Sequence, residues 1–449
     1  MDLIITNARL VTPDGVRPGG IAVQDGRIAR LLPPDVTVPA TQTIDAEGKY
    51  ALPGLIDSHV HFRTPGLTHK EDWAHAGRAA AAGGVTTVID MPNTRPALHR
   101  VEQAYEKAEL IEGNSLVDYR FHFGVVAETV SELESLPPRV ATSVKVFMTG
   151  HHTAPDVVRD PAVLERIFIT AAARDLRVIL HAEDDAIFSL LDLGTTAPTT
   201  YTDYEPRRPR SAAIVAVAKV IELARRHNTS THVLHVSSAE EAHLLTAARA
   251  AGIPITFETT PHHLSFVAED AARLGARIRL SPAIRQPHDR GTLWSALVAG
   301  HIATIGSDHA PHTLEEKSRP VPDAPPGLPG VQELLPAVFT GLRRRYPDTP
   351  IDDHLSLLSR VAAAEPARLF HIDHRKGSLA EGKDADIVLF DPHDTWPLTT
   401  PHTKSAWSAY EGWTFTGRPH LTLRRGTPIH TLATNTFGPP TGEWLPARP

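Results

Sequence analysis

The feature that most constrains the fold is a regular alternation of short apolar runs with longer alanine-rich stretches between residues 53 and 376. The short runs are rich in β-branched residues and bounded by turn-forming residues, which is typical of buried strands. Eight such runs are present: LIDSHVHF (55–62), TTVIDMP (86–92), YRFHFGVV (119–126), SVKVFM (143–148), RVILHAE (177–183), THVLHVSS (231–238), ITFETTP (255–261) and IATIGSDHAPH (302–312). Eight strands alternating with helices predict an α/β protein built on a (β/α)8 TIM barrel, a fold of about 250 residues that tolerates insertions.

The two ends of the chain have a different pattern. Residues 1–52 and 377–449 contain short strand-like runs that are separated by Pro, Gly and polar turn residues. Each segment is too short to be a stable β domain by itself. We therefore expect the two segments to pair into one small β-sandwich beside a barrel formed by residues 53–376.

The charge balance excludes several classes of partner. Lys and Arg number 45 against 52 Asp and Glu, so the net charge of −7 provides no basic surface of the kind that nucleic-acid binding needs. Asn7 and Arg9 interrupt the N-terminal apolar run before it reaches signal-peptide length. No run approaches the roughly 18 apolar residues of a membrane helix. We expect a cytoplasmic protein that binds neither nucleic acid nor membrane.

The chain has 26 His and no Cys, which restricts any metal site to His, carboxylates or a modified side chain. In the run DSHVHFR, alternate positions share one strand face, so His59, His61 and Arg63 are predicted to point the same way. Three further predicted strands end at His181, His235 and Asp308. Active sites of such barrels lie at this end of the strands. The pattern predicts a divalent-metal site, with Zn²⁺ the leading choice for imidazole and carboxylate ligands.

The four His and Asp308 make five candidate ligands. Five are too many for one catalytic zinc with an open position and too few for two zinc ions. Lys145, alone in the run SVKVFM, is a candidate for the missing bridge. Burial and nearby cations lower the pKa of a Lys amine. A neutral amine can add carbon dioxide to form an anionic carbamate that joins two metals. The alternative is that Lys145 forms a structural ion pair.

Several long blocks of the chain resemble the amidohydrolase superfamily and, within it, the dihydroorotases. The blocks are GLIDSHVHFRTPGLTHKEDW (54–73), AAAAGGVTTVIDMPNTRP (79–96), TTPHHLSF (259–266), SDHAPHTLEEK (307–317), PPGLPGVQELLP (325–336) and EGKDADIVLFDP (381–392). The blocks are spread over most of the chain, and their length makes the resemblance specific. The HxH pair alone would not identify the superfamily.

The resemblance implies a ligand set and a reaction. The implied ligands are His59, His61 and Asp308 for one metal, His181 and His235 for a second, and carboxylated Lys145 as the bridge. The family reaction is the reversible hydrolysis of L-dihydroorotate to N-carbamoyl-L-aspartate, a step of pyrimidine biosynthesis, in which a water shared by two metals ionises near neutral pH. Asp308 is the implied general acid and base.

The same resemblance implies that a substrate carboxylate contacts Arg63, Asn93 and His312. There are two departures: Ser281 precedes the Pro-Ala pair where the family usually has Asn or Arg, and Thr64 replaces the usual acid of the REPG motif. Ser281 donates only one hydrogen bond, so we expect it to anchor the substrate differently. The alternatives are a hydantoinase or allantoinase with the same metals, and a metal-free scaffold protein alongside aspartate transcarbamoylase.

Some positions have no assigned role. His262 and His263 lie in a matched block, where they either orient metal ligands or are structural. His151 and His152 follow the fourth predicted strand, and their role stays open. The proline-rich segment 318–330 follows the eighth strand and is either a lid over the site or a passive surface loop. We also expect a homo-oligomer.

Overall fold

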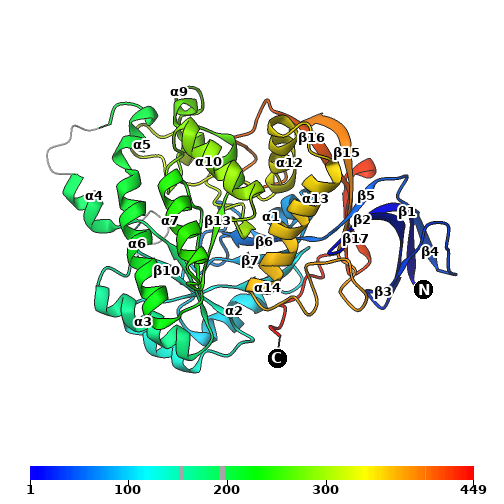
Figure 1. Ribbon diagram of the computed structural model, residues 1–449, viewed down its shortest axis with the longest axis horizontal. Helices are drawn as coiled ribbons and strands as arrows, with labels where there is room; N and C mark the ends of the chain where they lie inside the picture. The colour runs from blue at the N-terminus through cyan, green and yellow to red at the C-terminus, as the bar shows by residue number, and fades with distance from the viewer. Residues whose placement is uncertain (151–155, 192–197, 400, 449) are drawn as a thin grey trace.

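The computed structural model describes residues 1–150, 156–191, 198–399 and 401–448. Parallel strands form the centre of a barrel, helices cover its outside, and a large sheet made from both ends of the chain stands beside it (Figure 1). His151 and His152, whose role the sequence left open, lie outside the described residues.

The barrel contains the eight predicted strands, which pair in parallel with their neighbours. In chain order they are β6 (Leu55–Val60), β7 (Val85–Asp90), β8 (Asp118–Phe121) continued by β9 (Phe123–Gly124), β10 (Ser143–Phe147), β11 (Arg177–His181), β12 (Thr231–Val233), β13 (Ile255–Thr259) and β14 (Thr304–Ile305). A bridge between Val60 and His309 joins the first strand to the segment after the last one and closes the barrel. The predicted (β/α)8 fold is confirmed.

Three of these strands differ in extent from the prediction. The third is interrupted at His122, whose ring bonds to the Ser143 hydroxyl on β10 and to the Ser58 carbonyl on β6. The first ends at Val60 and the eighth is limited to Thr304–Ile305. Beyond them the chain turns away, with Arg63 (φ 65°) and Asp308 (φ 46°) in the left-handed region. The alternation of side chains expected for residues 57–63 therefore ends before Arg63 is reached.

Amphipathic helices cover the barrel because their small apolar residues pack closely onto the strands. In α6 (Arg210–His227), Ala213, Ala216 and Val220 are buried at helical spacing. The helix ends at Asn228, whose φ of 52° lies in the left-handed region that Asn tolerates. The other helices are α1 (Trp73–Ala82), α2 (Val101–Ile111), α3 (Pro161–Ala173), α4 (Asp185–Leu191), α5 (Tyr204–Arg207), α7 (Ala239–Ala250), α8 (Pro261–Ser265), α9 (Ala271–Leu274), α10 (Pro287–Val298), α11 (Leu314–Lys317), α12 (Leu334–Arg345), α13 (Ile351–Ser359) and α14 (Glu365–Leu369). None of the described helices combines the length and apolar character that a membrane crossing requires.

The two ends of the chain meet in one nine-stranded sheet, in the order β18-β17-β16-β15-β5-β1-β2-β3, with β4 paired to β1. Its strands are β1 (Leu3–Thr12), β2 (Gly15–Gln24), β3 (Arg27–Leu32), β4 (Gln42–Asp45), β5 (Tyr50–Pro53), β15 (Ile387–Pro397), β16 (Thr414–Arg424), β17 (Thr427–Thr431) and β18 (Thr436–Phe437). The N-terminal β5 pairs antiparallel with the C-terminal β15, where Ala51 lies opposite Leu389. The predicted pairing of the two segments is therefore present.

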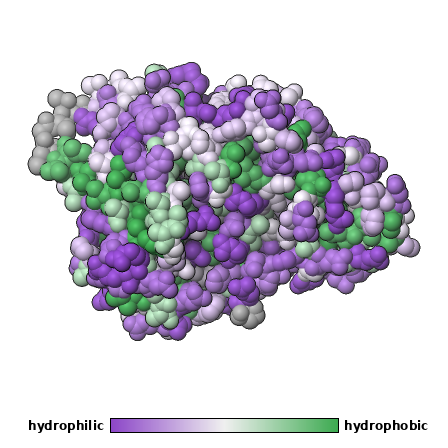
Figure 2. Space-filling view, in the orientation of Figure 1, coloured by the Kyte–Doolittle hydropathy of each residue, from purple (hydrophilic) through white to green (hydrophobic). Residues whose placement is uncertain are grey.

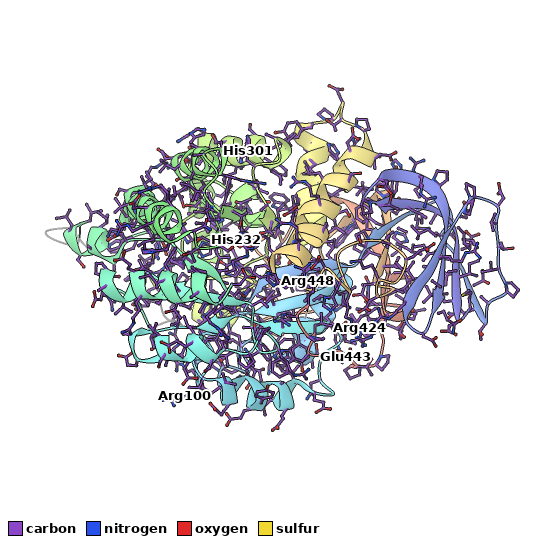
Figure 3. All side chains as sticks on the ribbon, turned by 60° about the horizontal axis from the view of Figure 1, so that its bottom comes forward. Arg100, His232, His301, Arg424, Glu443 and Arg448 are labelled. Carbon is purple, nitrogen blue, oxygen red and sulfur yellow. The ribbon has the colours of Figure 1, made fainter. Side chains whose placement is uncertain are left out.

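A buried ion cluster joins the sheet to the barrel. Lys376 Nζ lies 2.6 Å from a carboxylate oxygen of Asp118, at the start of β8. It lies 2.9 Å from Asp384 and 2.7 Å from Asp386, just ahead of β15. All four side chains are buried. Figure 3 labels three further side chains at this junction, Arg424, Glu443 and Arg448.

Candidate metal centre

The six predicted metal ligands come together at the carboxyl end of the barrel. They line one pocket, and they are His59 on β6, Lys145 on β10, His181 at the end of β11, and His61, His235 and Asp308 in the loops directly after β6, β12 and β14. Because the carboxyl ends of parallel barrel strands share one rim, side chains from distant parts of the chain meet here.

His59 and His61 approach Asp308 together. Their Nε2 atoms lie 3.2 and 3.3 Å from Asp308 Oδ1. His59, His235 and Asp308 each have one possible ligand atom that lies within 4.8 Å of those of the other two. Burial lowers the pKa of His59 to about 4, so its imidazole is neutral and offers a lone pair. This set of nitrogen and oxygen donors suits a divalent cation.

His181 and His235 face each other. Nδ1 of His181 lies 3.0 Å from Nε2 of His235, and burial lowers the pKa of both rings. His181 Nε2 bonds to Glu183 Oε2 at 2.7 Å, so the proton sits on Nε2 and the Nδ1 lone pair points at His235. His235 Nδ1 is buried without a hydrogen-bond partner among the described residues. Two neutral rings directed at one point are the arrangement that a metal ion needs.

Lys145 lines the same pocket, and its side chain is buried. Burial lowers the pKa of Lys145 to about 7, although the charges of Asp308 and Glu258 oppose this shift. Its Nζ lies 4.5 Å from the centre of the Phe147 ring. Within the described part of the chain Lys145 forms no ion pair, so the structural ion pair has no partner there.

Three residues hold the outer nitrogens of the metal-site histidines. Glu258 Oε1 lies 2.7 Å from His59 Nδ1, Asn93 Oδ1 lies 2.7 Å from His61 Nδ1, and Glu183 holds His181 as described. Such contacts fix ring orientation and the position of the ring proton in metal sites. Sequence reasoning missed both acids. A signal was present, because Glu258 is the one charged residue of the predicted strand ITFETTP and Glu183 follows His181 by two residues.

Arg208 holds Glu183 in turn. The Arg208 Nε and Nη2 groups donate to Glu183, with Nε 2.9 Å and Nη2 2.5 Å from Oε2. Burial alone would raise the pKa of Glu183, but the charges of Arg208 and His181 and their hydrogen bonds together outweigh this effect and lower the pKa to about 2. Glu183 is thus a permanent anion, and it keeps the outer proton of His181 in place.

Arg63 contributes a buried cation to the same pocket. Its Nη2 group donates to the Pro311 carbonyl at 3.3 Å. Its Nε and Nη1 groups have no hydrogen-bond partner among the described residues. A buried donor without a partner is costly, and a charged one more so, which indicates a binding site for an anionic group of a ligand.

The other predicted substrate contacts are placed differently. Asn93 supports His61 as above. His312 is buried behind the pocket wall, with Nδ1 3.0 Å from Lys70 Nζ and Nε2 3.0 Å from the Pro326 carbonyl. It is absent from the residues that line the pocket in the described structure. Ser281 does line the pocket, and its hydroxyl bonds to the Tyr204 hydroxyl at 2.9 Å.

Segment 318–330 forms part of the pocket wall. Pro326 and Gly327 line the pocket. The buried Lys317 donates to the carbonyl groups of Pro325 and Gly327 at 2.9 and 2.8 Å. Arg279 donates to the Pro322 and Ala324 carbonyls. These bonds anchor residues 322–327 at the pocket wall.

His262 and His263 are buried in supporting positions. His262 Nδ1 lies 3.1 Å from the Tyr410 hydroxyl, and His263 Nε2 lies 3.3 Å from the Pro282 carbonyl. Tyr410 belongs to the C-terminal segment between β15 and β16, which thereby reaches the barrel. These contacts support the structural alternative for both His.

Comparisons with known proteins agree with this geometry. The model of the amidohydrolase family matches residues 50–429. This chain belongs to the amidohydrolase family.

Relatives within the amidohydrolase family have more than one name. An allantoinase of Streptomyces avermitilis is 34% identical over 100% of this chain and 99% of its own length. A dihydroorotase of Halobacterium salinarum is 36% identical over 86% of this chain and 88% of its own. The solved structure of the L-hydantoinase (dihydropyrimidinase) from Arthrobacter aurescens matches with a TM-score of 0.92 at 28% identity, over 98% of both chains.

Proposed function

We propose that this protein is a dihydroorotase, which reversibly hydrolyses L-dihydroorotate to N-carbamoyl-L-aspartate. The family and the names of the relatives support hydrolysis of a cyclic amide. The choice of substrate rests on Arg63, which lines the pocket of the metal-site residues and whose guanidinium nitrogens Nε and Nη1 have no hydrogen-bond partner among the described residues. Dihydroorotate has a carboxylate that a guanidinium can bind, whereas allantoin and hydantoin have none.

Two divalent cations fit the donor set, and Zn²⁺ is the leading choice for imidazole and oxygen ligands. When bound, they would supply an ionised water near neutral pH and polarise the amide carbonyl. His59, His61 and Asp308 would hold one cation, and His181 and His235 the other. Lys145 would bridge them as a carbamate, because its pKa of about 7 leaves a substantial share of the buried amine uncharged and able to add carbon dioxide.

Asp308 carries the proton in this proposal. Its carboxylate lies beside the Nε2 atoms of His59 and His61 at the pocket wall, where the scissile amide would lie. In hydrolysis Asp308 takes the proton of the attacking water and delivers it to the ring nitrogen that leaves. In cyclisation the same carboxylate takes the proton of the carbamoyl nitrogen.

Arg63 orients the substrate by pairing its free N–H groups with the carboxylate. Asn93 and His312 act through other residues. Asn93 orients the His61 ring by its bond to Nδ1, and His312 positions Pro326 by its bond to the Pro326 carbonyl. Ser281, which also lines the pocket, would offer one hydrogen bond to the substrate.

A hydantoinase or allantoinase is the second candidate. Ser281, whose hydroxyl bonds to the Tyr204 hydroxyl, is a neutral pocket residue at the position where dihydroorotases usually have Asn or Arg. The deciding experiment is an assay of the metal-loaded enzyme on dihydroorotate, dihydrouracil, hydantoin and allantoin. We expect turnover of dihydroorotate, and opening of only the uncharged rings would refute the assignment.

A metal-free scaffold is a third, remote candidate. It is disfavoured because all six ligand positions are filled and directed into one pocket. Elemental analysis should find close to two metal ions per chain, and a chain without metal after supply of Zn²⁺ and bicarbonate would support the scaffold. An association with aspartate transcarbamoylase stays a prediction.

A further inference from the structure

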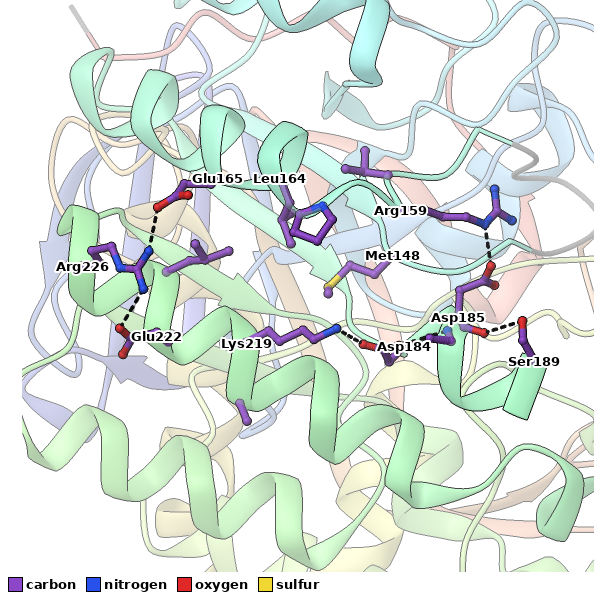
Figure 4. Close-up of a pocket in the computed structure, with 15 residues that line it drawn as sticks. Met148, Arg159, Leu164, Glu165, Asp184, Asp185, Ser189, Lys219, Glu222 and Arg226 are labelled. Atoms are coloured by element: carbon purple, nitrogen blue, oxygen red, sulfur yellow. Dashed lines mark hydrogen bonds and ion pairs between the residues drawn. The ribbon is translucent and has the colours of Figure 1, made fainter. Parts of the chain in front are cut away.

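Two grooves on the outside of the barrel differ in how their charges are balanced. Helices α3, α4 and α6 border the first groove (Figure 4). Figure 2 shows hydrophobic residues gathered over α4 and the neighbouring part of α6. The charged side chains of this groove are paired with one another: Arg159 with Asp185, Lys219 with Asp184, and Arg226 with both Glu165 and Glu222. A groove neutralised in this way has little attraction for a charged ligand.

The second groove lies between α8, α9, α10 and α12 and is strongly basic. Its charged lining residues are four Arg and one Asp: Arg273, Arg290, Arg344, Arg345 and Asp270. Its volume of about 380 Å³ falls in the range of small-molecule sites, about 300 to 1,000 Å³. It shares no lining residue with the pocket of the metal-site residues, as far as the described chain extends. We call it the arginine groove.

The cations of the arginine groove are poorly neutralised within the chain. Arg290, Arg344 and Arg345 form no ion pair with any described residue, and Arg273 lies 3.9 Å from Asp270. Arg290 Nη1 donates to a main-chain carbonyl at 3.0 Å. Its Nε atom is buried without a hydrogen-bond partner among the described residues. Because a buried donor of a charged group is costly to leave unpaired, the arrangement indicates a place for an anion.

The position of Arg290 on its helix points the same way. Arg290 is the fourth residue of α10, near the N-terminus, where the helix dipole disfavours a cation. Arg345 ends α12, and the dipole of that helix favours a cation there. Burial lowers the pKa of Arg345, and the charge of Arg290 lowers it further. Helix dipoles therefore explain the Arg residues of α12 but not Arg290, and a bound anion would remove the repulsion between them.

Aromatic rings form a wall beside these cations. Phe266, Trp294 and Trp413 line the groove. The Trp294 ring is buried and held by its Nε1 group, which donates to the Leu264 carbonyl at 2.8 Å. Gly341 leaves the room for this ring, since a Cβ atom there would lie 2.4 Å from it. Trp413 is half-buried and contacts Phe266, with ring centres 5.6 Å apart. The exposed part of Trp413 offers a surface on which a flat ring can stack.

We propose that the arginine groove binds a nucleoside diphosphate, with its phosphate groups on the guanidinium groups and its base against Trp413. Guanidinium groups bind phosphate oxygens through paired hydrogen bonds. Four Arg and one Asp leave an excess of three positive charges. Two linked phosphate groups carry about three negative charges near neutral pH, which matches that excess. A single carboxylate would leave most of it unbalanced, and a nucleic acid would need basic surface that a chain of net charge −7 lacks.

The first test is isothermal titration calorimetry of the metal-loaded protein with UDP, ADP and inorganic pyrophosphate. We expect one saturable site per chain for at least one of the two nucleotides. Pyrophosphate should bind at least tenfold more weakly than that nucleotide because it has no ring to stack. Arg63→Met separates the groove from the metal-site pocket, and it should leave the affinity for the nucleotide unchanged.

The second test replaces cations of the groove. Arg290→Gln and Arg345→Gln should each weaken nucleotide binding about tenfold or more, because each removes a charge-assisted hydrogen bond, and hydrolysis per chain should not change. Arg225→Gln is the matched control, since Arg225 is exposed on α6 and paired with Glu222. Thermal unfolding identifies any loss of fold, and Arg345 has an exposed side chain that α12 does not need for packing.

Four results would overturn the proposal. They are the absence of saturable binding of both nucleotides, equal affinities for pyrophosphate and the nucleotide, an unchanged affinity in the folded Arg345→Gln protein, and loss of binding in Arg63→Met. The last result would place the nucleotide in the metal-site pocket.

Discussion

Replacing Arg63 with methionine separates the proposed substrate from the uncharged cyclic amides. Methionine fills similar space but removes the buried charge and the planar set of donors. Arg63 is not a metal-site residue, so the metal content of the variant should equal that of the wild type. The change therefore isolates recognition of the carboxylate.

The expected magnitude follows from the partners of the guanidinium. Nη2 is already bonded to the Pro311 carbonyl, whereas Nε and Nη1 have no partner among the described residues. Two charge-assisted hydrogen bonds contribute about 1.5 to 3 kcal/mol each, or about 3 to 6 kcal/mol together. A tenfold change in rate corresponds to about 1.4 kcal/mol, so kcat/KM for dihydroorotate should fall by about 10²- to 10⁴-fold.

The assay compares kcat/KM for dihydroorotate and dihydrouracil, which differ by the carboxylate. Dihydrouracil makes no use of the guanidinium, so its opening should change less than about tenfold. Arg63→Lys is the matched variant because it keeps the charge but loses the two-pronged geometry, and it should fall between the wild type and methionine. Equal losses on both substrates, at unchanged metal content, would refute a role for Arg63 in binding the carboxylate.

Four further predictions follow from buried contacts. Lys145→Ala should lose metal and activity, with partial recovery in added acetate or propionate; full metal retention would contradict the carbamate bridge. Glu183→Gln should weaken metal retention in a chelator titration by about 10- to 100-fold, because the carboxylate that joins Arg208 to the His181 ring is lost. Glu222→Gln, which changes an exposed ion pair, is the control and should have no effect. Burial raises the pKa of Glu333 from 4.5 to about 7, so the folded chain binds this proton more tightly than the unfolded chain and loses about 3 kcal/mol of stability as the pH rises between these values. Urea unfolding of Glu333→Gln should show less of this decrease than the wild type, and identical pH profiles would contradict the assignment. Lys376→Met should lower the free energy of unfolding by about 3 to 5 kcal/mol because three buried carboxylates lose their shared cation, whereas Lys404→Met, at a partly exposed pair, should cost below about 1 kcal/mol.

The barrel and the position of the metal-site residues were open to prediction for the same reason. A parallel barrel consists of strands that alternate with helices along the chain, and each strand can be recognised in the sequence as a short apolar run. His181, at the end of one such run, and His59, within another, must meet because all strand ends share one rim. Lys145 could be identified as a candidate for a similar reason, since it is the one charged side chain in the run SVKVFM.

The residues that hold the metal-site histidines in place could not be predicted in this way. Glu258 is 199 residues from His59, and Arg208 is 25 residues from Glu183, so their contacts exist only once the barrel has closed. The surroundings of His312 were likewise beyond such reasoning, because its ring contacts Lys70, 242 residues away in the chain, and the Pro326 carbonyl.

By itself, the sequence determined which strands and helices form and which side chains carry the chemistry, because both depend on residues close together in the chain. Only the tertiary structure decided that Arg63 has two guanidinium nitrogens without a partner among the described residues, and that Pro326 and Gly327 line the same pocket. These properties are set by which groups are left without a partner after packing, and that depends on contacts between segments far apart in the chain.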